Sequence, residues 1–475
     1  MGGTGAPPTV STNPDAPPAP TTPTGGPAPP VSGRGPRGPQ RRRRGHRTWL
    51  VIVVAAVVVA AGVLGYLYFE AKKVPCGQRS GTISVWQDFS PTEFPAFSKA
   101  VAQFEVANPG LSVSWVNETS PSPSNYVAAA LACQAPDILI GASDFAGGLY
   151  YDGFLANLSS LLPSSAFTPF LPEALSDNTQ FGGVFGVPLN VNGVAMIYNK
   201  ELIPVAPTTT DQMISEAKNA TVTSAGTITT AGLVYGLDSD GGYRIPAWAA
   251  GFGGVLFNKN GTPAMGSAAW ANAWTFTNNF TTVDGIEPKG ITSEATWEAL
   301  FEEKKAGIIF DGPWDIEEYI TALGETNVGV APMPMVSQTG LWPEPLWGSI
   351  GAYVALPLAS GADSGLFNAS VKFAQFLASP LVEGELWNSS GDIPSLASTF
   401  SYVRSLNVPF VNGFLDQFYN HSQPFPNTVQ MTYYWTPFTD ECTAYLAGSV
   451  SAQGGVSAIQ TAVLQSMQEN HIAPY

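Results

Sequence analysis

The sequence predicts an α/β protein built on an open, mostly parallel sheet with helices on both faces, preceded by a disordered tail and one transmembrane helix. From Thr82 onward the apolar pattern alternates between short strands and amphipathic helices, the order that gives parallel sheets. The chain has 475 residues, more than a single hydrophobic core usually serves, so two folded lobes are expected. Residues 49–69 form an unbroken apolar run, which predicts a membrane span.

The first 80 residues divide into a tail, a membrane segment and a linker. Residues 1–48 are rich in Pro and Gly and end in a basic cluster, which predicts a disordered cytoplasmic tail. Trp49–Phe69 carries no charge and would span roughly 31 Å as a helix, the thickness of a bilayer core. This run and its leader are too long for a cleaved signal peptide. Because arginine clusters stay in the cytoplasm, residues 70–475 are expected outside the cell, beginning with a linker over 70–80.

The charge of the extracellular part argues against nucleic acid as a partner. Residues 1–73 hold nine Lys/Arg and two acids, a net of +7, so the total of −16 leaves −23 for residues 74–475. A domain this acidic is a poor binder of nucleic acid or anionic membrane. The three cysteines, Cys76, Cys133 and Cys442, allow at most one disulfide, and Cys133 has two possible partners.

Eight N-x-Ser/Thr sequons lie in the same acidic part of the chain. Such a number is typical of a glycosylated surface protein, such as those of archaea. The sequons begin at Asn117, Asn157, Asn219, Asn260, Asn279, Asn368, Asn388 and Asn420.

The first half of the extracellular part alternates strands with helices. Strands or extended segments are predicted at Thr82–Trp86, Leu111–Val116, Asp137–Ile140, Gly186–Pro188 and Ala195–Tyr198. Helices are predicted at Phe97–Ala107 and Tyr126–Cys133, with Leu149–Leu162 as helix or turn.

The second half adds strands and helices around a Thr-rich stretch. Residues 223–232, TSAGTITTAG, predict an exposed loop after a short helix at Met213–Lys218. Strands are predicted at Val328–Met333 and Ser349–Leu356. Helices are predicted at Ser370–Leu377, Leu381–Trp387, Trp435–Leu446 and Val456–Glu469.

The segment AGIIFDGPWDIEEY, at Ala306–Tyr319, carries the clearest indication of a ligand site. Its apolar run predicts a buried strand, which Asp311-Gly312-Pro313 ends before a helix with acids in its first turn. Trp314 is therefore held at the edge of an α/β sheet, where ligand crevices form. An indole there offers a flat platform to an apolar ring face such as that of a pyranose. The alternative is a core tryptophan packed under a loop.

The sequence lacks the residues of common catalytic and metal sites. Its histidines are only His46, His421 and His471, and it has no G-x-S-x-G elbow, so no metal, cofactor or enzymatic activity is predicted. A cell-surface glycosidase is the main alternative, because it also combines aromatic rings with carboxylates across a cleft. A sensor or adhesin ectodomain is a further alternative, although residues 1–40 contain no signalling element.

An ordered set of blocks connects the chain to a known family. The blocks are Trp86-Gln87-Asp88, APDILIGASDFAGGLYYDGFLANL at Ala135–Leu158, GVPLNVNGVAMIYNKELI at Gly186–Ile203, AAGFGGVLFNKNG at Ala249–Gly261, the Trp314 segment and VGVAPMP at Val328–Pro334. Together they resemble the maltose/maltodextrin-type extracellular solute-binding proteins of ABC importers, over roughly residues 81–475. YNKEL is the most specific piece.

The resemblance implies a periplasmic-binding-protein-like fold of type II, in which two α/β lobes joined by crossing strands close on a ligand. Lobe 1 would take residues 81–190 and 347–398, and lobe 2 residues 191–346 and 399–475. It also implies a membrane-anchored receptor that captures an oligosaccharide or disaccharide and passes it to ABC permease subunits. A receptor of the same fold for a non-sugar solute is an alternative.

Site residues follow from the resemblance position by position. Asp88 and Asp144 match positions that hydrogen-bond sugar hydroxyls, and Asn192 stands where relatives commonly carry an acid. Tyr243, Trp314 and Trp435 match stacking positions in lobe 2. Trp86 belongs to the expected site, with Trp347 and Tyr434 as secondary candidates. The turn before Asp144 lacks the aromatic residue of some maltodextrin binders, so maltodextrin is less strongly implied than a sugar.

Overall fold

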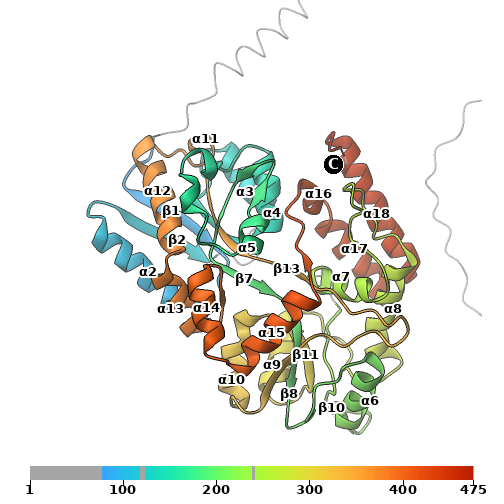
Figure 1. The fold of residues 1–475 in the computed structure, drawn as a ribbon. Helices are drawn as coiled ribbons and strands as arrows, with labels where there is room; N and C mark the ends of the chain where they lie inside the picture. Colours follow the sequence, from blue (N-terminus) through green and yellow to red (C-terminus); the bar gives the residue numbers. More distant parts are fainter. Residues whose placement is uncertain (1–77, 118–122, 238–240, 474–475) are drawn as a thin grey trace, which may run out of the picture. The chain divides into compact units, whose positions relative to one another are not determined.

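The computed structural model describes residues 78–117, 123–237 and 241–473 (Figure 1). The predicted tail and transmembrane helix lie outside these ranges, as does Cys76. Within them, no helix is both long and apolar enough to cross a membrane. Cys133 is disulfide-bonded, and Cys442 is fully buried.

A five-stranded sheet forms the centre of the first lobe, in the order β2-β1-β3-β14-β6. Its strands are β1 (Thr82–Gln87), β2 (Ser112–Asn117), β3 (Ile138–Ala142), β6 (Val187–Pro188) and β14 (Ile350–Val354). β1 is parallel to β2 and β3, whereas β14 is antiparallel to both of its neighbours. The prediction of a mostly parallel sheet is confirmed in this lobe.

Helices that are distant in sequence cover this sheet together. The helices of the first lobe are α2 (Phe94–Ala107), α3 (Pro123–Leu131), α4 (Ser143–Tyr151), α5 (Pro172–Asp177), α11 (Pro357–Ser360), α12 (Ser364–Leu377) and α13 (Pro380–Ser390). α12 and α13, from the last third of the chain, lie beside α2 (Figure 1). Their apolar faces bury Phe104 against Phe373, with ring centroids 4.7 Å apart.

Short elements complete the first lobe. They are η1 (Leu158–Ser160), η2 (Ser164–Ala166), β4 (Thr179–Gln180) and β5 (Gly183–Val184). The helix expected near Leu149–Leu162 begins earlier, at Ser143, and ends where Gly153 adopts φ +78°. As a consequence, Asp144 lies in the first turn of α4 instead of in a loop.

The second lobe has a three-stranded sheet, in the order β11-β8-β12. β8 (Ala195–Asn199) is antiparallel to both β11 (Ile308–Asp311) and β12 (Val328–Ala331), unlike the parallel pairs of the first sheet. The helices of the rest of the chain are α6 (Thr210–Ala220), α7 (Gly241–Gly251), α8 (Ala268–Thr282), α9 (Glu294–Glu302), α10 (Ile316–Leu323), α15 (Pro409–Asn420), α16 (Val429–Thr432), α17 (Trp435–Leu446) and α18 (Ala452–Glu469). Of these, α16 packs on α4 of the first lobe, and α17 and α18 pack on each other.

The Thr-rich stretch of the second lobe is a hairpin, not the expected loop. β9 (Val222–Ser224) pairs with β10 (Thr227–Thr230) across Ala225-Gly226. Both turn residues have positive φ, the conformation that two-residue hairpins require. Alternating β-branched side chains favour the strands on either side.

A small sheet connects the two lobes, in the order β15-β7-β13-β16. β7 (Asn190–Gly193) leads from β6 into β8, and β13 (Leu346–Gly348) leads back to β14 (Figure 1). β15 (Ile393–Pro394) pairs with β7, and β16 (Gln423–Pro424) pairs with β13. After β15 the chain continues through α14 (Ala397–Ser405) to α15. These short strands are the hinge between the lobes.

Candidate functional site

A direct hydrogen bond joins the two lobes near the hinge. Asp144, in the first turn of α4, is 4% exposed, and its Oδ2 accepts a hydrogen bond of 2.9 Å from Trp435 Nε1 at the start of α17. β3 ends directly before α4, so the carboxylate lies at the carboxyl edge of the first sheet. This is the edge at which α/β sheets bind ligands.

Aromatic rings of the second lobe surround this contact. The Tyr243 ring, on α7, lies 5.3 Å from Phe425, and Phe425 meets Trp435 edge to face at 6.3 Å. Tyr243 also donates from its hydroxyl to Leu346 O at 3.1 Å, which fixes the ring against hinge strand β13. Tyr243 and Trp435 are both half-buried, so each retains accessible ring surface.

Trp314 lies at the predicted strand-to-helix turn. β11 ends at Asp311, and a 3-10 turn, η3 (Pro313–Asp315), leads into α10. The indole folds back over Gly312, where an added Cβ would lie 1.9 Å from the ring. The backbone carbonyl oxygen of Trp314 accepts hydrogen bonds from Thr92 Oγ1 at 3.3 Å and Ser90 Oγ at 3.5 Å, so this turn also contacts the first lobe.

The remaining polar candidates lie at strand ends of the first lobe and hinge. Asp88 follows β1 directly and is half-buried. Trp86, near the end of the same strand, packs edge to face on Tyr126 at 6.3 Å. Asn192 lies on β7 and pairs with Gly348 of β13, at the hinge.

Two expected site residues have other surroundings. Tyr434 is fully buried, its ring packs on Trp270 and Phe438, and its hydroxyl donates to Gly242 O at 3.0 Å. Trp347 stacks on Phe418 with ring planes 15° apart, and both line a small groove with Leu171 and Phe400. The Trp347 ring therefore lies apart from the group formed by Asp144, Tyr243 and Trp435, whereas the buried Tyr434 ring packs on Trp435 with ring centroids 5.3 Å apart.

Sequence reasoning did not identify two residues beside this group. Phe425 is 8% exposed and braces Tyr243 and Trp435, although nothing in its local sequence marks it. Asp177, at the end of α5, accepts hydrogen bonds from Ser349 N at 2.7 Å and Ser349 Oγ at 3.0 Å. Burial raises the pKa of Asp177 to about 7, and the charge of Asp144 adds to the shift. Burial also raises the pKa of Tyr243, with contributions from Asp144, Asp177 and Asp311.

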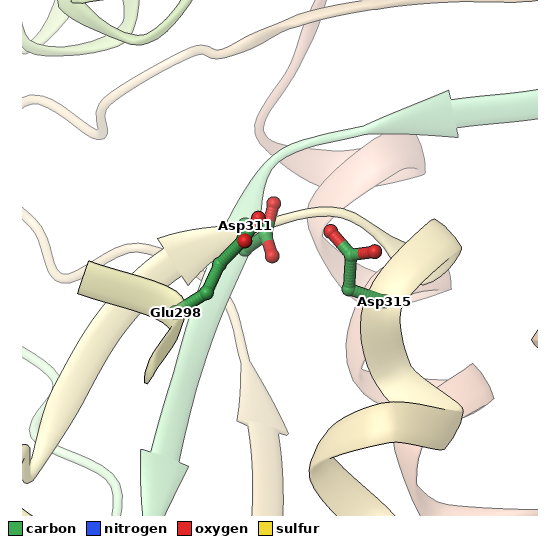
Figure 2. Close-up of side chains that lie close together, drawn as sticks. All are labelled: Glu298, Asp311 and Asp315. Carbon is green, nitrogen blue, oxygen red and sulfur yellow. The ribbon is translucent and has the colours of Figure 1, made fainter. Parts of the chain in front are cut away.

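Three carboxyl groups, those of Glu298, Asp311 and Asp315, lie close together (Figure 2). Glu298 comes from α9, Asp311 from the end of β11 and Asp315 from η3, and one carboxylate oxygen of each lies within 4.8 Å of the others. Asp311 accepts from Gly312 N at 2.8 Å and from Tyr319 Oη at 2.5 Å. These bonds hold the backbone that positions Trp314.

The electrostatics of this carboxyl cluster favour shared protons. Burial raises the pKa of Asp311 to about 6, that of Glu298 to about 8 and that of Asp315 to about 10, and neighbouring carboxylates add to the last two shifts. Oxygen ligands of this kind suit hard cations. Both oxygens of Asp311 accept hydrogen bonds, and a proton shared among the three groups would relieve the repulsion between their charges.

Relatives of known function are similar over most of the chain. The chain is 26% identical over 371 residues to the maltotriose-binding protein of Pyrococcus abyssi, which covers 77% of each protein. It is also 26% identical over 354 residues to a maltooligosaccharide ABC transporter solute-binding lipoprotein of Streptococcus pneumoniae, covering 70% of this chain and 77% of that one.

Solved structures share the two-lobe fold. The maltose/maltodextrin-binding domain MalE from Bdellovibrio bacteriovorus, bound to maltotriose, has a TM-score of 0.76 and 26% identity, with 82% of this chain and all of that chain covered. The maltotriose-binding protein of Thermus thermophilus has a TM-score of 0.70 at 21% identity, a likeness of fold alone. Residues 99–401 match the family model of bacterial extracellular solute-binding proteins, and the chain belongs to this family.

Proposed function

We propose that this protein captures a sugar outside the cell, an oligosaccharide or disaccharide of the maltotriose class, and delivers it to the permease subunits of an ABC importer. The observation that carries this proposal is the meeting of Asp144 from one lobe with Trp435 from the other, 2.9 Å apart, beside the partly accessible Tyr243 ring. The names of the relatives, which bind maltotriose and maltooligosaccharides, support the ligand class.

The residue types suit a sugar. Sugars present rims of hydroxyl groups and apolar C–H faces, so a site needs flat rings together with carboxylate or amide partners. Tyr243, Trp314 and Trp435 supply rings, whereas Asp88, Asp144 and Asn192 supply polar groups. A ligand that contacts both groups binds the closed form better than the open form, and this difference drives closure.

The anchor and the location of the protein belong to the same proposal. Trp49–Phe69 would span the membrane once, with residues 1–48 in the cytoplasm and the two lobes, glycosylated, at the cell surface. Tethering would keep the receptor close to its permease and raise its effective concentration there. The lobe boundaries near residues 190, 346 and 398 remain part of this prediction.

Isothermal titration calorimetry of the full-length protein in mild detergent tests the proposal. The titrants are maltose, maltotriose and maltotetraose, with cellotriose, an amino acid and a short peptide as controls. Replacing Trp314 or Trp435 with Ala should weaken binding by about 1–3 kcal/mol, or roughly 5- to 150-fold. Tyr402→Ala, an exposed ring on α14, is the matched control and should change nothing.

Three results would contradict the proposal. Hydrolysis of the bound sugar on overnight incubation would favour a glycosidase. Binding of only a non-sugar solute would agree with a solute-binding protein but contradict a carbohydrate ligand. Unchanged affinity in both tryptophan variants would contradict the proposed binding site.

A further inference from the structure

A pair of buried acids lies where the first lobe, the hinge and the Trp314 turn meet. Glu93 directly precedes α2 and is 3% exposed, and Asp392 directly precedes β15 and is 2% exposed. α13, which ends two residues before Asp392, packs along α2. Neighbouring Gly391 approaches Ile316 and the carbonyl oxygen of Pro313 in the second lobe. The pair therefore lies next to a contact between the two lobes, made by Gly391.

The carboxyl groups of Glu93 and Asp392 lie within reach of each other. Glu93 Oε1 and both oxygens of Asp392 are buried and make no well-formed hydrogen bond with the described residues, although the side chains of Ser390 and Asn190 lie beside Asp392. Two adjacent ionised carboxylates in such a place would repel one another without compensation. One shared proton turns the same contact into a carboxyl–carboxylate hydrogen bond.

The surroundings favour that proton. Burial and the charge of Asp392 raise the pKa of Glu93 well above its ordinary value, and burial raises the pKa of Asp392. The side chains of Ser390 and Asn190 only partly offset the shift of Asp392.

Charged groups on the neighbouring elements are directed elsewhere. Lys99 of α2 pairs with Glu385 of α13 at 2.6 Å, and Glu383 of α13 accepts from Ser395 and Leu396. Asp315 belongs to the cluster of three carboxyl groups, and α10 carries Glu317, Glu318 and Tyr319, of which Tyr319 bonds to Asp311. Besides burial, the charge that contributes most to the pKa shift of Glu93 is that of Asp392.

Glu93 connects this pair to the contact between the lobes. Its Oε2 accepts from Ser90 N at 2.6 Å and closes the turn over residues 90–93. Ser90 and Thr92 of this turn are the residues whose hydroxyls reach the Trp314 carbonyl oxygen. Ser389 Oγ, from the end of α13, donates to Thr92 O and ties the turn to the same region.

We propose that Glu93 and Asp392 are a positioning pair that shares one proton in the closed form, so that ligand affinity falls as the pH rises and the proton is lost. This inference rests on the proposed function, because the affinity in question is that for the sugar. In this proposal closure increases the burial of the pair, so that the closed form holds the proton more tightly than the open form. Closure is therefore favoured at low pH. It weakens as the pH rises past the value at which the pair loses its proton in the closed form.

The test is calorimetric titration of the full-length protein with maltotriose at pH 5.5 to 9, in buffers of different ionisation enthalpy. The wild type should take up protons on binding, and its affinity should fall by at most about tenfold per pH unit, the limit for one proton. Glu93→Gln supplies a permanent N–H donor to Asp392. The affinity of this variant for maltotriose should therefore stay, at every pH, at the value that the wild type has at low pH, and fewer protons should be taken up on binding. Asp392→Asn should flatten the profile as well and serves if the first variant folds poorly.

Glu287→Gln is the matched control. Glu287 is also a buried acid with a raised pKa, but it binds Tyr235 N and Gly236 N inside the second lobe, away from the junction. This variant should keep the wild-type profile of affinity against pH. The inference is overturned if wild-type affinity is independent of pH, or if both pair variants retain its slope. Absence of maltotriose binding at every pH would instead overturn the sugar that the proposed function names.

Discussion

At the scale of single residues, the Asp144–Trp435 hydrogen bond is the most informative contact in the molecule. It joins a buried carboxylate of the first lobe to an indole N–H of the second, and both residues stand at helix starts that their sheet and helix packing fix. An acceptor with this charge strengthens the bond relative to a neutral one. The contact therefore reports on closure as well as on ligand binding.

A double-mutant cycle measures this contact. Asp144→Asn weakens the acceptor and Trp435→Phe removes the donor, so each should lower maltotriose affinity. Their effects should be non-additive by about 1–2 kcal/mol, the range for a hydrogen bond to a charged group. Asp152→Asn, an exposed acid at the end of the same helix, should have no effect. Strict additivity of the two changes would mean that the bond contributes nothing to binding.

The carboxyl cluster of Glu298, Asp311 and Asp315 predicts a stability that depends on pH. Because burial and like charges raise the pKa of Asp315 to about 10, the folded protein holds a proton that the unfolded chain releases near pH 4. Stability should therefore fall as the pH rises between these values, by up to about 1.4 kcal/mol per pH unit for one proton.

The variant Asp315→Asn tests this pH dependence, because its amide has no carboxyl proton to lose as the pH rises. Thermal unfolding between pH 5 and pH 9 should show a shallower loss of stability than in the wild type. Glu303→Gln, an exposed acid paired with Lys305, should reproduce the wild-type slope. Equal slopes for Asp315→Asn and the wild type would refute the shared proton.

At the scale of elements, local patterns predicted most strands and helices but not their pairing. Thr82–Trp86 and Trp435–Leu446 correspond closely to β1 and α17, because the apolar period and flanking turn residues act locally. The antiparallel direction of β8 depends on contacts with β11 and β12, over a hundred residues away. In the stretch after α6, Gly and Thr predict a turn, but the pairing of β9 with β10 leaves no strong apolar pattern in the sequence.

The site residues likewise divide into those that local sequence predicts and those that depend on distant contacts. Trp314 could be predicted, because Asp311-Gly312-Pro313 ends a strand locally and holds the ring at the sheet edge. Phe425 and Asp177 could not, because each reaches the site through the packing of a distant hinge segment. Tyr434 directly precedes α17 and was grouped with Trp435, but its ring points into the core and only that of Trp435 meets Asp144.

The Trp314 turn depends on a close approach at Gly312. Gly312→Ala would place a methyl group against the indole, so the ring must move. Maltotriose affinity should drop about tenfold or more, and stability by about 1–3 kcal/mol, as for other overpacked sites. Gly384→Ala in α13 is the matched control, because a Cβ there meets no atom within 4 Å. Retention of full affinity by Gly312→Ala would show that the ring position does not govern binding.

At the scale of the whole molecule, two lobes with separate cores are joined by short hinge strands. The first core is centred on Ile83, Val85 and Phe373, and the second on Trp248, Trp270 and Trp274. Such an arrangement permits closure by rotation about β7 and β13, with little change inside either lobe. The contacts of Asp144 with Trp435 and of Thr92 with the Trp314 carbonyl oxygen join the two lobes, so we expect opening to break them.

The central claim is that a maltotriose-class sugar closes these lobes, and the most direct measurement is the distance between them with and without the sugar. Spin labels at Val106→Cys and Val283→Cys, exposed positions in the first and second lobe, allow double electron–electron resonance on the full-length protein in a background in which Cys442 is replaced by Ser. Saturating maltotriose should convert a broad distance distribution into a single narrow one, and cellotriose should leave it unchanged. A distribution that maltotriose does not alter, although calorimetry detects binding, would contradict closure of the lobes on the sugar.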